Sequence, residues 1–248
     1  MEMKSDKRYF NFPLMFIKNA HTNIKKVMDD IMYYCIVKYA EDLPETEGNL
    51  FERVQKAALF FGITISDSEG LYSKTSLEFA IENGKKLVKE VETARQTGES
   101  IIYTDIDKYI AFEFYKNSKS NFDIDCLLMF LAVRSLTWNK SFIKTTNKFL
   151  LYRMAGFGVP KGELPEELKK YADGTGKIKR YSMEKLKLAV MMRYPQIQFV
   201  GIKGKKGLYV TSKLSLEQLI DKIYNNKSYK TRMEERRIKI NQLIKQQL

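Results

Sequence analysis

Residues 196–211 read QIQFVGIKGKKGLYVT, and this stretch decides how the second half of the chain is organised. Two runs rich in β-branched and aromatic residues, 196–202 and 208–211, flank a short glycine-bounded segment, 203–207. This pattern predicts a β-hairpin with 203–207 as its turn. A turn needs no lysine to form, whereas a loop that reaches a phosphate group uses them. The lysines of this turn are Lys203, Lys205 and Lys206.

Two helices are predicted well upstream of the hairpin. Apolar residues at helical spacing indicate a first helix that Asp123 or Asp125 caps and that ends near residue 138. A second, shorter helix begins at Thr145 or Thr146. It stops at Gly156, because glycine is favoured just past the C-terminus of a helix.

A third predicted helix directly precedes the hairpin. Ser182 is its expected N-cap, and Pro195 ends it after Tyr194. A polar insertion at 158–179, with a short helix opened by Pro165, separates this helix from the second one.

Residues 123–213 therefore give three helices, a strand, a basic turn and a second strand. This order resembles the winged helix-turn-helix family of DNA-binding domains. The resemblance implies that residues 146–156 are the second helix and that the third helix, 182–194, enters the major groove. It also implies that residues 197–211 form a wing that touches the DNA backbone or the minor groove.

Two features depart from the family's pattern. The insertion replaces the tight turn that usually joins the second and third helices, and the third helix exposes Leu188, Met191 and Met192 beside its lysines. A second resemblance, carried by Lys148–Gly156 and Gly207–Leu219, is to uncharacterised proteins of bacterial plasmids and phages. It implies that the chain is encoded by a mobile element.

The positive charge of the chain lies almost entirely in its second half. Residues 1–120 hold 17 Lys and Arg against 19 Asp and Glu, a net charge of −2. Residues 121–248 hold 26 against 11, a net charge of +15, and the two halves sum to +13. A strongly basic half indicates a polyanionic partner, and nucleic acid is the first candidate because Lys and Arg neutralise phosphates.

Basic residues of several predicted elements could form one DNA-binding face. They would supply affinity and register, while Tyr181, Lys185, Lys187 and Gln198 are the candidates for reading base edges. The three basic residues just before Ser182, which are Lys177, Lys179 and Arg180, would sit at the anion-favouring start of the third helix. The predicted DNA-binding residues are Lys144, Lys148, Arg153, Lys177, Lys179, Arg180, Lys185, Lys187, Lys203, Lys205 and Lys206.

The first half reads as a helical module of residues 1–120 that serves oligomerisation or partner contact. Helices are expected over about 22–42 and 50–61, and from a Ser73 cap to about residue 94. A fourth is expected over 105–115, with a strand left open by its aromatic and β-branched residues. Residues 116–121 are the expected linker, at the same place as the change in charge.

The chain ends in two helices with clear start signals. Capping boxes open them at Ser215 and Thr231. The last helix carries Met233, Ile240 and Ile244 on a narrow stripe, so it is expected to dock on the body or to pair with a second chain. We therefore divide the chain into 1–120, a basic winged-helix-like domain at 121–225, and a charged C-terminal helix at 226–248.

Composition excludes several classes of function. The longest apolar run, 126–133, is too short to cross a membrane, and the polar N-terminus lacks a secretion signal, so a cytoplasmic protein is expected. Cys35 and Cys126 are expected to be buried thiols rather than a disulfide. One histidine, His21, and two distant cysteines cannot build a zinc finger or a paired-histidine metal site. His21 itself is interpreted as a polar residue near a helix cap.

A metal-dependent nuclease is the catalytic alternative. Its carboxylates would come from Asp105 and Asp107, or Asp123 and Asp125. Glu113 and Lys116 would complete the first set, but the spacing is unusual and aspartates before apolar helices are commonly N-caps. No phosphate-binding Gly-x-x-x-x-Gly-Lys-Ser/Thr loop is present.

The sequence thus predicts a mainly α protein that binds double-stranded DNA without catalysis, cofactor or metal. It would act as a transcription regulator or as a replication or partition accessory protein, with homo-oligomers through residues 1–120 or 229–248. Two alternatives stay open. One is a structural or scaffold protein with a basic docking half, and the other is RNA binding through Tyr181, Tyr194, Phe199 and Tyr209.

Overall fold

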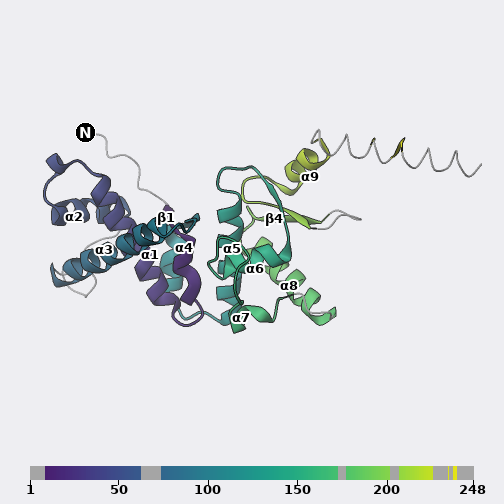
Figure 1. Cartoon of the computed structure of the whole chain (residues 1–248), viewed down its shortest axis with the longest axis horizontal. Helices are drawn as coiled ribbons and strands as arrows, with labels where there is room; N and C mark the ends of the chain where they lie inside the picture. The colour runs from purple at the N-terminus through teal and green to yellow at the C-terminus, as the bar shows by residue number, and fades with distance from the viewer. Residues whose placement is uncertain are drawn as a thin grey trace, which may run out of the picture.

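A computed structural model describes residues 9–62, 74–172, 177–201, 207–225, 234 and 237–238, with the backbone alone at 74–76 and 177–181. The chain is mainly α-helical with two small antiparallel sheets, so the mainly α part of the predicted fold class is confirmed, while the winged-helix-like domain stays a prediction (Figure 1). Within these residues, no helix combines the length and apolar character needed to cross a bilayer.

The first half is built around helix α1, Ile24–Asp42. Helices α2 (Leu50–Phe60), α3 (Lys74–Gln96) and α4 (Lys108–Lys116) all pack against it. The helix is apolar on most sides because it is enclosed in this way, with Met28, Ile31 and Val37 fully buried. The short 3-10 turns Leu14–Asn19 (η1) and Glu45–Glu47 (η2) precede and follow α1. The predicted helices over 22–42 and 50–61 are confirmed, whereas Ser73 lies outside the described residues.

The first half also contains a two-stranded sheet. Strand β1, Tyr9–Pro13, pairs antiparallel with β2, Tyr103–Asp107, with Phe10 opposite Ile106. The expected helix over 105–115 is therefore wrong in its first turn, because Ile106 is buried by this strand pairing. The helix begins only at Lys108, where the Asp107 carboxylate accepts a hydrogen bond of 2.9 Å from the Tyr109 backbone N–H.

The second half begins with α5, Asn121–Leu136, which is almost entirely buried. Ser120 caps it, and Asp123 at the third helical position completes a reciprocal capping box. The expected caps Asp123 and Asp125 were thus misplaced, because the hydroxyl of Ser120 is the N-cap acceptor and takes the hydrogen bond of the Asp123 backbone N–H. Asp125 lies inside the helix and faces the protein interior.

Strand β3, Ile143–Thr145, and helix α6, Asn147–Met154, follow α5. Thr146 caps α6 by accepting a hydrogen bond from the Phe149 N–H, and Gly156 ends it at φ +80°, both as predicted. The insertion contains the one-turn helix α7, Glu166–Lys169. Helix α8, Lys177–Arg193, starts five residues before the expected Ser182 cap, so Ser182 lies within the helix.

The predicted hairpin is confirmed in its strands. Strand β4, Gln198–Gly201, pairs antiparallel with β5, Leu208–Thr211, and the turn at 202–206 lies outside the described residues. Strand β3 adds a third strand that the sequence did not reveal, giving the order β3-β5-β4. Helix α9, Leu216–Asn225, packs on β4 and is opened by the predicted capping box at Ser215.

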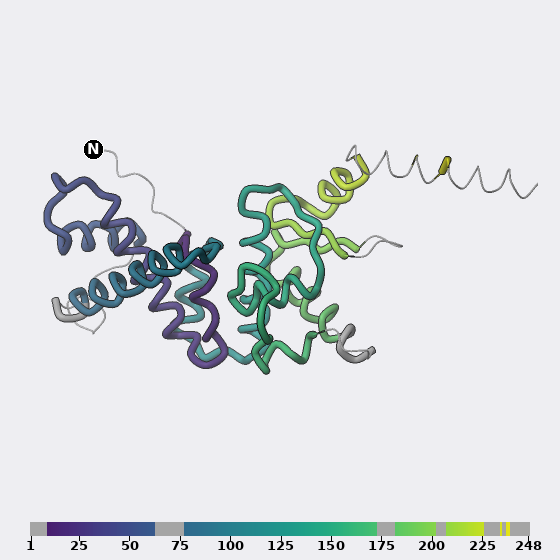
Figure 2. Tube along the Cα trace, in the orientation of Figure 1, coloured from purple at the N-terminus to yellow at the C-terminus, as the bar shows by residue number. Residues whose placement is uncertain are grey.

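The two halves lie side by side (Figure 2), and α5 of the second half contacts β2 and η1 of the first. The Thr104 hydroxyl of β2 donates a 3.0 Å hydrogen bond to the Leu131 carbonyl of α5, and Arg134 of α5 pairs with Asp105 of β2. One hydrophobic cluster runs from Phe10 in β1 to Val210 in β5. Residues 117–120 form the short connection between α4 and α5, and the proposed division into domains stays a prediction.

Candidate nucleic-acid interface

The three-stranded sheet brings Lys144 to the base of the basic hairpin turn. Lys144 on β3 lies opposite Tyr209 on β5, and both side chains reach the outer face of the sheet. Gly207 closes the turn at φ +90°, where a Cβ atom would lie 2.7 Å from the Thr145 carbonyl oxygen and 3.4 Å from Lys144 Cε. The lysine at 144 is therefore adjacent to the end of a turn that contains three more. Those three, Lys203, Lys205 and Lys206, lie outside the described residues.

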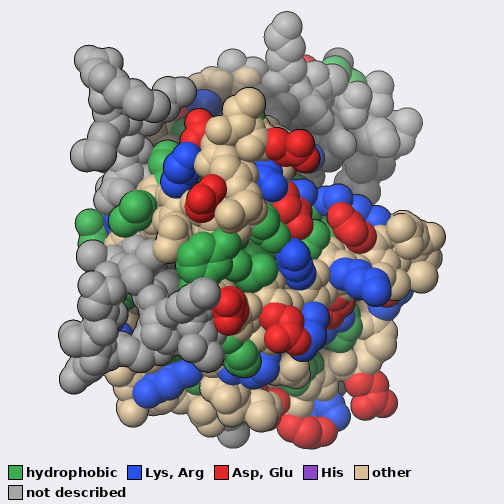
Figure 3. Space-filling model, turned by 90° about the vertical axis from the view of Figure 1, so that its left-hand side faces the viewer, with side chains coloured by type: hydrophobic (Ala, Val, Ile, Leu, Met, Phe, Trp, Pro, Cys, Tyr) green, Lys and Arg blue, Asp and Glu red, His purple; other side chains and the backbone are tan. Residues whose placement is uncertain are grey.

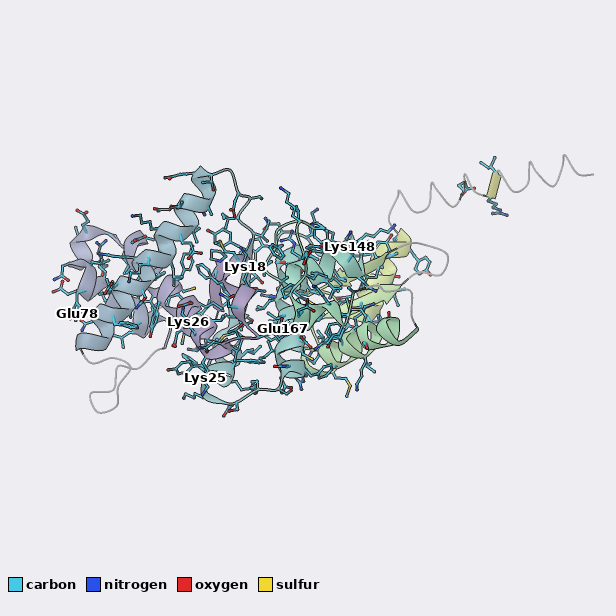
Figure 4. The ribbon with its side chains drawn as sticks, turned by 60° about the horizontal axis from the view of Figure 1, so that its bottom comes forward. Lys18, Lys25, Lys26, Glu78, Lys148 and Glu167 are labelled. Atoms are coloured by element: carbon cyan, nitrogen blue, oxygen red, sulfur yellow. The ribbon has the colours of Figure 1, made fainter. Side chains whose placement is uncertain are left out.

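Lys148 extends this basic surface onto α6. Its side chain is exposed in the first turn of the helix, two residues after the Thr146 cap. A cation at this place opposes the helix dipole, so Lys148 is not there to stabilise α6. Among the residues that the structure describes, no carboxylate forms an ion pair with Lys144 or Lys148, so both charges remain available to a partner. Figure 4 shows Lys148 on the second half, apart from Lys25 and Lys26 on the first.

Arg153 does not belong to this surface. Its side chain is buried, with the residue only 8% exposed, and its guanidinium lies 5.2 Å from the ring centre of Phe149. Nε and Nη1 are enclosed and have no hydrogen-bond partner in the described part of the chain. Burial lowers the pKa of this guanidinium. A group enclosed in this way cannot contact a phosphate on the surface, so we withdraw it from the predicted interface.

Helix α8 presents a mixed face. Lys185 is exposed and lies 5.9 Å from the ring centre of Phe122, whereas Lys187 is buried and donates a 2.9 Å hydrogen bond to Glu184. Lys187 is therefore withdrawn as well. Leu188 and Met192 are 56% and 76% exposed, so the apolar character expected of this helix is real; Met191 is half-buried.

The remaining basic candidates lie at the start of α8. Because the helix begins at Lys177, the residues Lys177, Lys179 and Arg180 occupy its first turn instead of preceding it. The structure describes only the backbone of these residues and of Tyr181. Gln198 was also proposed as a base reader, and its side-chain amide donates a 2.7 Å hydrogen bond to the Pro195 carbonyl.

The aromatic residues that suggested RNA binding are only partly accessible. Tyr194 is buried and stacks on Phe130 with ring centres 4.4 Å apart. Phe199 and Tyr209 are half-buried. A base-stacking platform needs exposed rings, so this arrangement offers fewer of them than the sequence suggested.

The carboxylates of the nuclease alternative have structural partners. Asp105 binds Arg134 through both oxygens, and Asp107 caps α4. Asp123 bonds Ser120 and pairs with Arg193; the Ser120 hydrogen bond is the main cause that lowers the Asp123 pKa to about 2. Glu113 pairs with Lys119. Within the described ranges, no three His, Cys, Asp or Glu side chains are grouped as metal ligands.

A buried polar cluster around Asp125 was missed by sequence reasoning. Asp125 is completely buried and accepts hydrogen bonds from His21 Nε2 at 2.8 Å and the Tyr171 hydroxyl at 2.7 Å, while Lys170 Nζ lies 2.7 Å from its second oxygen. Burial favours the neutral acid, but these partners outweigh burial and hold the pKa of Asp125 below its usual value. The interpretation of His21 as a polar residue near a helix cap is correct in position, but it missed the contact of the imidazole with Asp125. The cap of α1 is Asn23, and the imidazole is turned inward onto Asp125.

The two buried cysteines are free thiols, as predicted. Cys35 donates a 3.1 Å hydrogen bond to the Asn11 carbonyl, and burial raises the pKa of Cys126 to about 11. Cys126 thus lacks the low pKa of a reactive thiol, which is consistent with a packing role.

The two halves also differ in their surface charge. On the face of the first half shown in Figure 3, acidic and basic side chains alternate without a large patch of one sign. Many of its lysines are paired along helices, as in Lys26–Asp30 and Lys86–Glu82. The surplus of positive charge therefore belongs to the second half, where Lys144 and Lys148 lie beside the hairpin.

Comparison of the chain with protein-family models, with curated proteins and with solved structures returns no match. The site is therefore interpreted from its own geometry.

Proposed function

We propose that the protein binds double-stranded DNA without catalysis, through the basic face formed by β3, the start of α6 and the hairpin turn. The observation that carries this proposal is the position of Lys144 and Lys148. Both are exposed, neither has an ion-pair partner among the described residues, and strand pairing puts Lys144 next to the end of a turn with three lysines. Clustered, unpaired cations of this kind bind phosphates and release counterions.

The element order supports a winged-helix-like arrangement as part of this proposal. Helices α5, α6 and α8 precede the β4–β5 hairpin, and β3 anchors the hairpin to the helices. Residues 155–176 replace the usual tight turn, and the exposed face of α8 is partly apolar. We therefore assign affinity to the hairpin face and give α8 no specific base-reading role. A regulator or a replication or partition accessory protein would use such a module.

The test is a salt titration of binding to mixed-sequence duplex DNA. Log affinity decreases with log salt, and each phosphate contact contributes about 0.9 to the steepness of this decrease. For the variant Lys203→Ala/Lys205→Ala/Lys206→Ala, the slope should therefore be shallower by about 2–3. The variant Lys85→Ala/Lys86→Ala/Lys89→Ala on α3 removes the same charge from the first half and should leave the slope unchanged. Equal slopes for the wild type and the hairpin variant would remove the hairpin from the interface.

Lys144→Ala/Lys148→Ala tests the described part of the face separately. The slope should fall by up to about 2, and affinity should decrease alike for all duplex sequences. Competition by single-stranded RNA that matches duplex DNA would instead favour the RNA-binding alternative.

A second candidate function is protein docking by a scaffold protein. The exposed Leu188 and Met192 on α8 favour it, because apolar side chains at helical spacing fit a protein surface better than a phosphate backbone. No binding to duplex DNA at roughly 50 mM salt, where phosphate contacts are strongest, would make this candidate the leading one.

A further inference from the structure

Helix α9 carries apolar side chains on two faces. Leu219 and Ile223 are buried on the side that packs on β4. Leu216, Ile220 and Tyr224 remain 46%, 37% and 49% exposed. These three are four residues apart, so they form one stripe along the helix. We call it the α9 stripe. A contiguous apolar stripe next to a packed face is typical of a surface that another polypeptide covers.

The α9 stripe has an acidic border. Glu217 and Asp221 each follow a stripe residue by one position, which places both carboxylates along the side of the stripe that faces away from β4. Both residues are exposed, and in the described ranges neither forms an ion pair. The surface therefore fits a helix that is apolar along one line and basic beside it.

The C-terminal segment of the chain has this chemistry. Residues 226–248 contain seven Lys and Arg against two Glu. Met233, Ile240 and Ile244 recur at helical spacing, and Arg236 and Arg237 lie next to that line. The segment's 23 residues would measure about 35 Å as a helix, more than twice the length of α9. It is therefore long enough to cover the whole α9 stripe.

The described residues of this segment do not cover α9 of their own chain. Glu234, Arg237 and Ile238 are exposed, with Ile238 at 52%, and Figures 1 and 2 draw this short piece apart from α9. Direct antiparallel pairing of two α9 helices is also disfavoured. A twofold axis between antiparallel helices brings each edge against its own copy, so the carboxylates of Glu217 and Asp221 would face each other.

We propose that the α9 stripe binds residues 226–248 of a second copy of this chain. The exchange is reciprocal, because each copy offers one stripe and one basic segment, and it gives a closed dimer. This inference goes beyond the proposed DNA binding and does not depend on it.

Sedimentation equilibrium of the full chain without DNA tests the proposal. The wild type should dimerise, and Ile220→Ser should raise the dimer dissociation constant about tenfold or more, because it removes a central apolar contact. Leu59→Ser is the control, since Leu59 is also an exposed apolar residue, at 59%, but lies on α2 of the first half, and it should leave the constant unchanged. A monomeric wild type, or an unchanged constant for Ile220→Ser, would overturn the proposal.

A charge exchange separates contacts between copies from contacts within one chain. Glu217→Lys/Asp221→Lys and Arg236→Glu/Arg237→Glu should each be monomeric, while a mixture of the two variants should form heterodimers. Circular dichroism of each variant checks that its helices are intact. If mixing restores nothing while all four changes in one chain restore dimers, the acidic border and the basic segment act within one chain. That result would overturn the exchange between copies.

Discussion

Helices α5 and α6 pack against each other, and each buries one charged side chain, Asp125 in α5 and Arg153 in α6. Asp125 is fully enclosed and receives three polar contacts, from His21, Lys170 and Tyr171. Arg153 is nearly as enclosed, but its Nε and Nη1 have no partner within the described residues. The two charges are thus buried to a similar degree and satisfied to opposite degrees.

This difference separates the free-energy cost of burying a charge from the stabilisation that hydrogen-bond partners provide. Burial disfavours the charged form of both groups, raising the pKa of an acid and lowering that of a base. For Asp125 the hydrogen bonds reverse the effect of burial, and its pKa is lowered; for Arg153 burial acts alone, and its pKa is also lowered. The charged form is therefore favoured by the fold at Asp125 and disfavoured at Arg153.

The largest effect is expected from Asp125→Ala. It leaves the buried imidazole of His21 and the buried hydroxyl of Tyr171 without their shared acceptor, whereas the half-exposed ammonium of Lys170 can turn to water. The loss should therefore be about 2–4 kcal/mol of the free energy of unfolding. Urea denaturation at pH 7 measures it. A loss below about 1 kcal/mol would show that water replaces the carboxylate at little cost and would end the contrast with Arg153.

Arg153→Met should change stability in the opposite direction. It removes a buried cation with two unpartnered nitrogens and keeps a side chain of similar length, so a gain of about 1–3 kcal/mol is expected. Arg153→Lys serves as the control, since it retains a buried positive charge and should give no gain. Destabilisation by Arg153→Met would mean that the guanidinium has favourable contacts that outweigh its unpartnered nitrogens.

Acid should remove the contribution of Asp125. Because its folded pKa is lowered, the stabilisation is fully present above the unfolded value of about 3.9 and is lost as pH falls through the folded value. The difference in unfolding free energy between the wild type and Asp125→Ala should therefore be constant from pH 7 to 5 and shrink below pH 4. A difference that shrinks between pH 7 and 5 instead would assign the pH dependence to a group other than this carboxylate.

The smallest effect is expected at an exposed pair. Lys26 and Asp30 are 2.5 Å apart on the surface of α1, and Lys26→Ala should change stability by no more than about 0.5 kcal/mol. The same denaturation assay measures it. A loss comparable with that of Asp125→Ala would show that pairing alone, without burial, accounts for the larger effect.

Local signals in the sequence were sufficient for much of the second half. The glycines and β-branched residues of 196–211 predicted the β4–β5 hairpin, and Thr146 and Gly156 fixed both ends of α6. These features succeed because caps and turns depend on a few neighbouring residues. Strand β3 was missed, since its three residues are recognisable only by their partner β5, more than 60 residues later.

The charged residues were harder to place. A lysine or arginine in a basic segment suggests a surface, yet Arg153 and Lys187 lie on the inward sides of α6 and α8. The position of a residue around its helix axis could have indicated this, because Arg153 follows the buried Leu150 by three. Asp125 carried a different signal, an isolated acid within the apolar run Ile124–Leu131. Its partner His21 is 104 residues away, beyond the range of any local pattern.

The pairing of β1 with β2 also determines when β1 can fold during synthesis of the chain. Tyr9 lies opposite Asp107, so the first strand must wait for 98 further residues before its partner leaves the ribosome. At about 5–20 residues per second this delay is roughly 5–20 s. During that interval Phe10 and Phe12, both fully buried in the finished protein, have no strand to cover them. The nascent chain is therefore expected to present the aromatic segment 9–13 to chaperones until β2 has been synthesised.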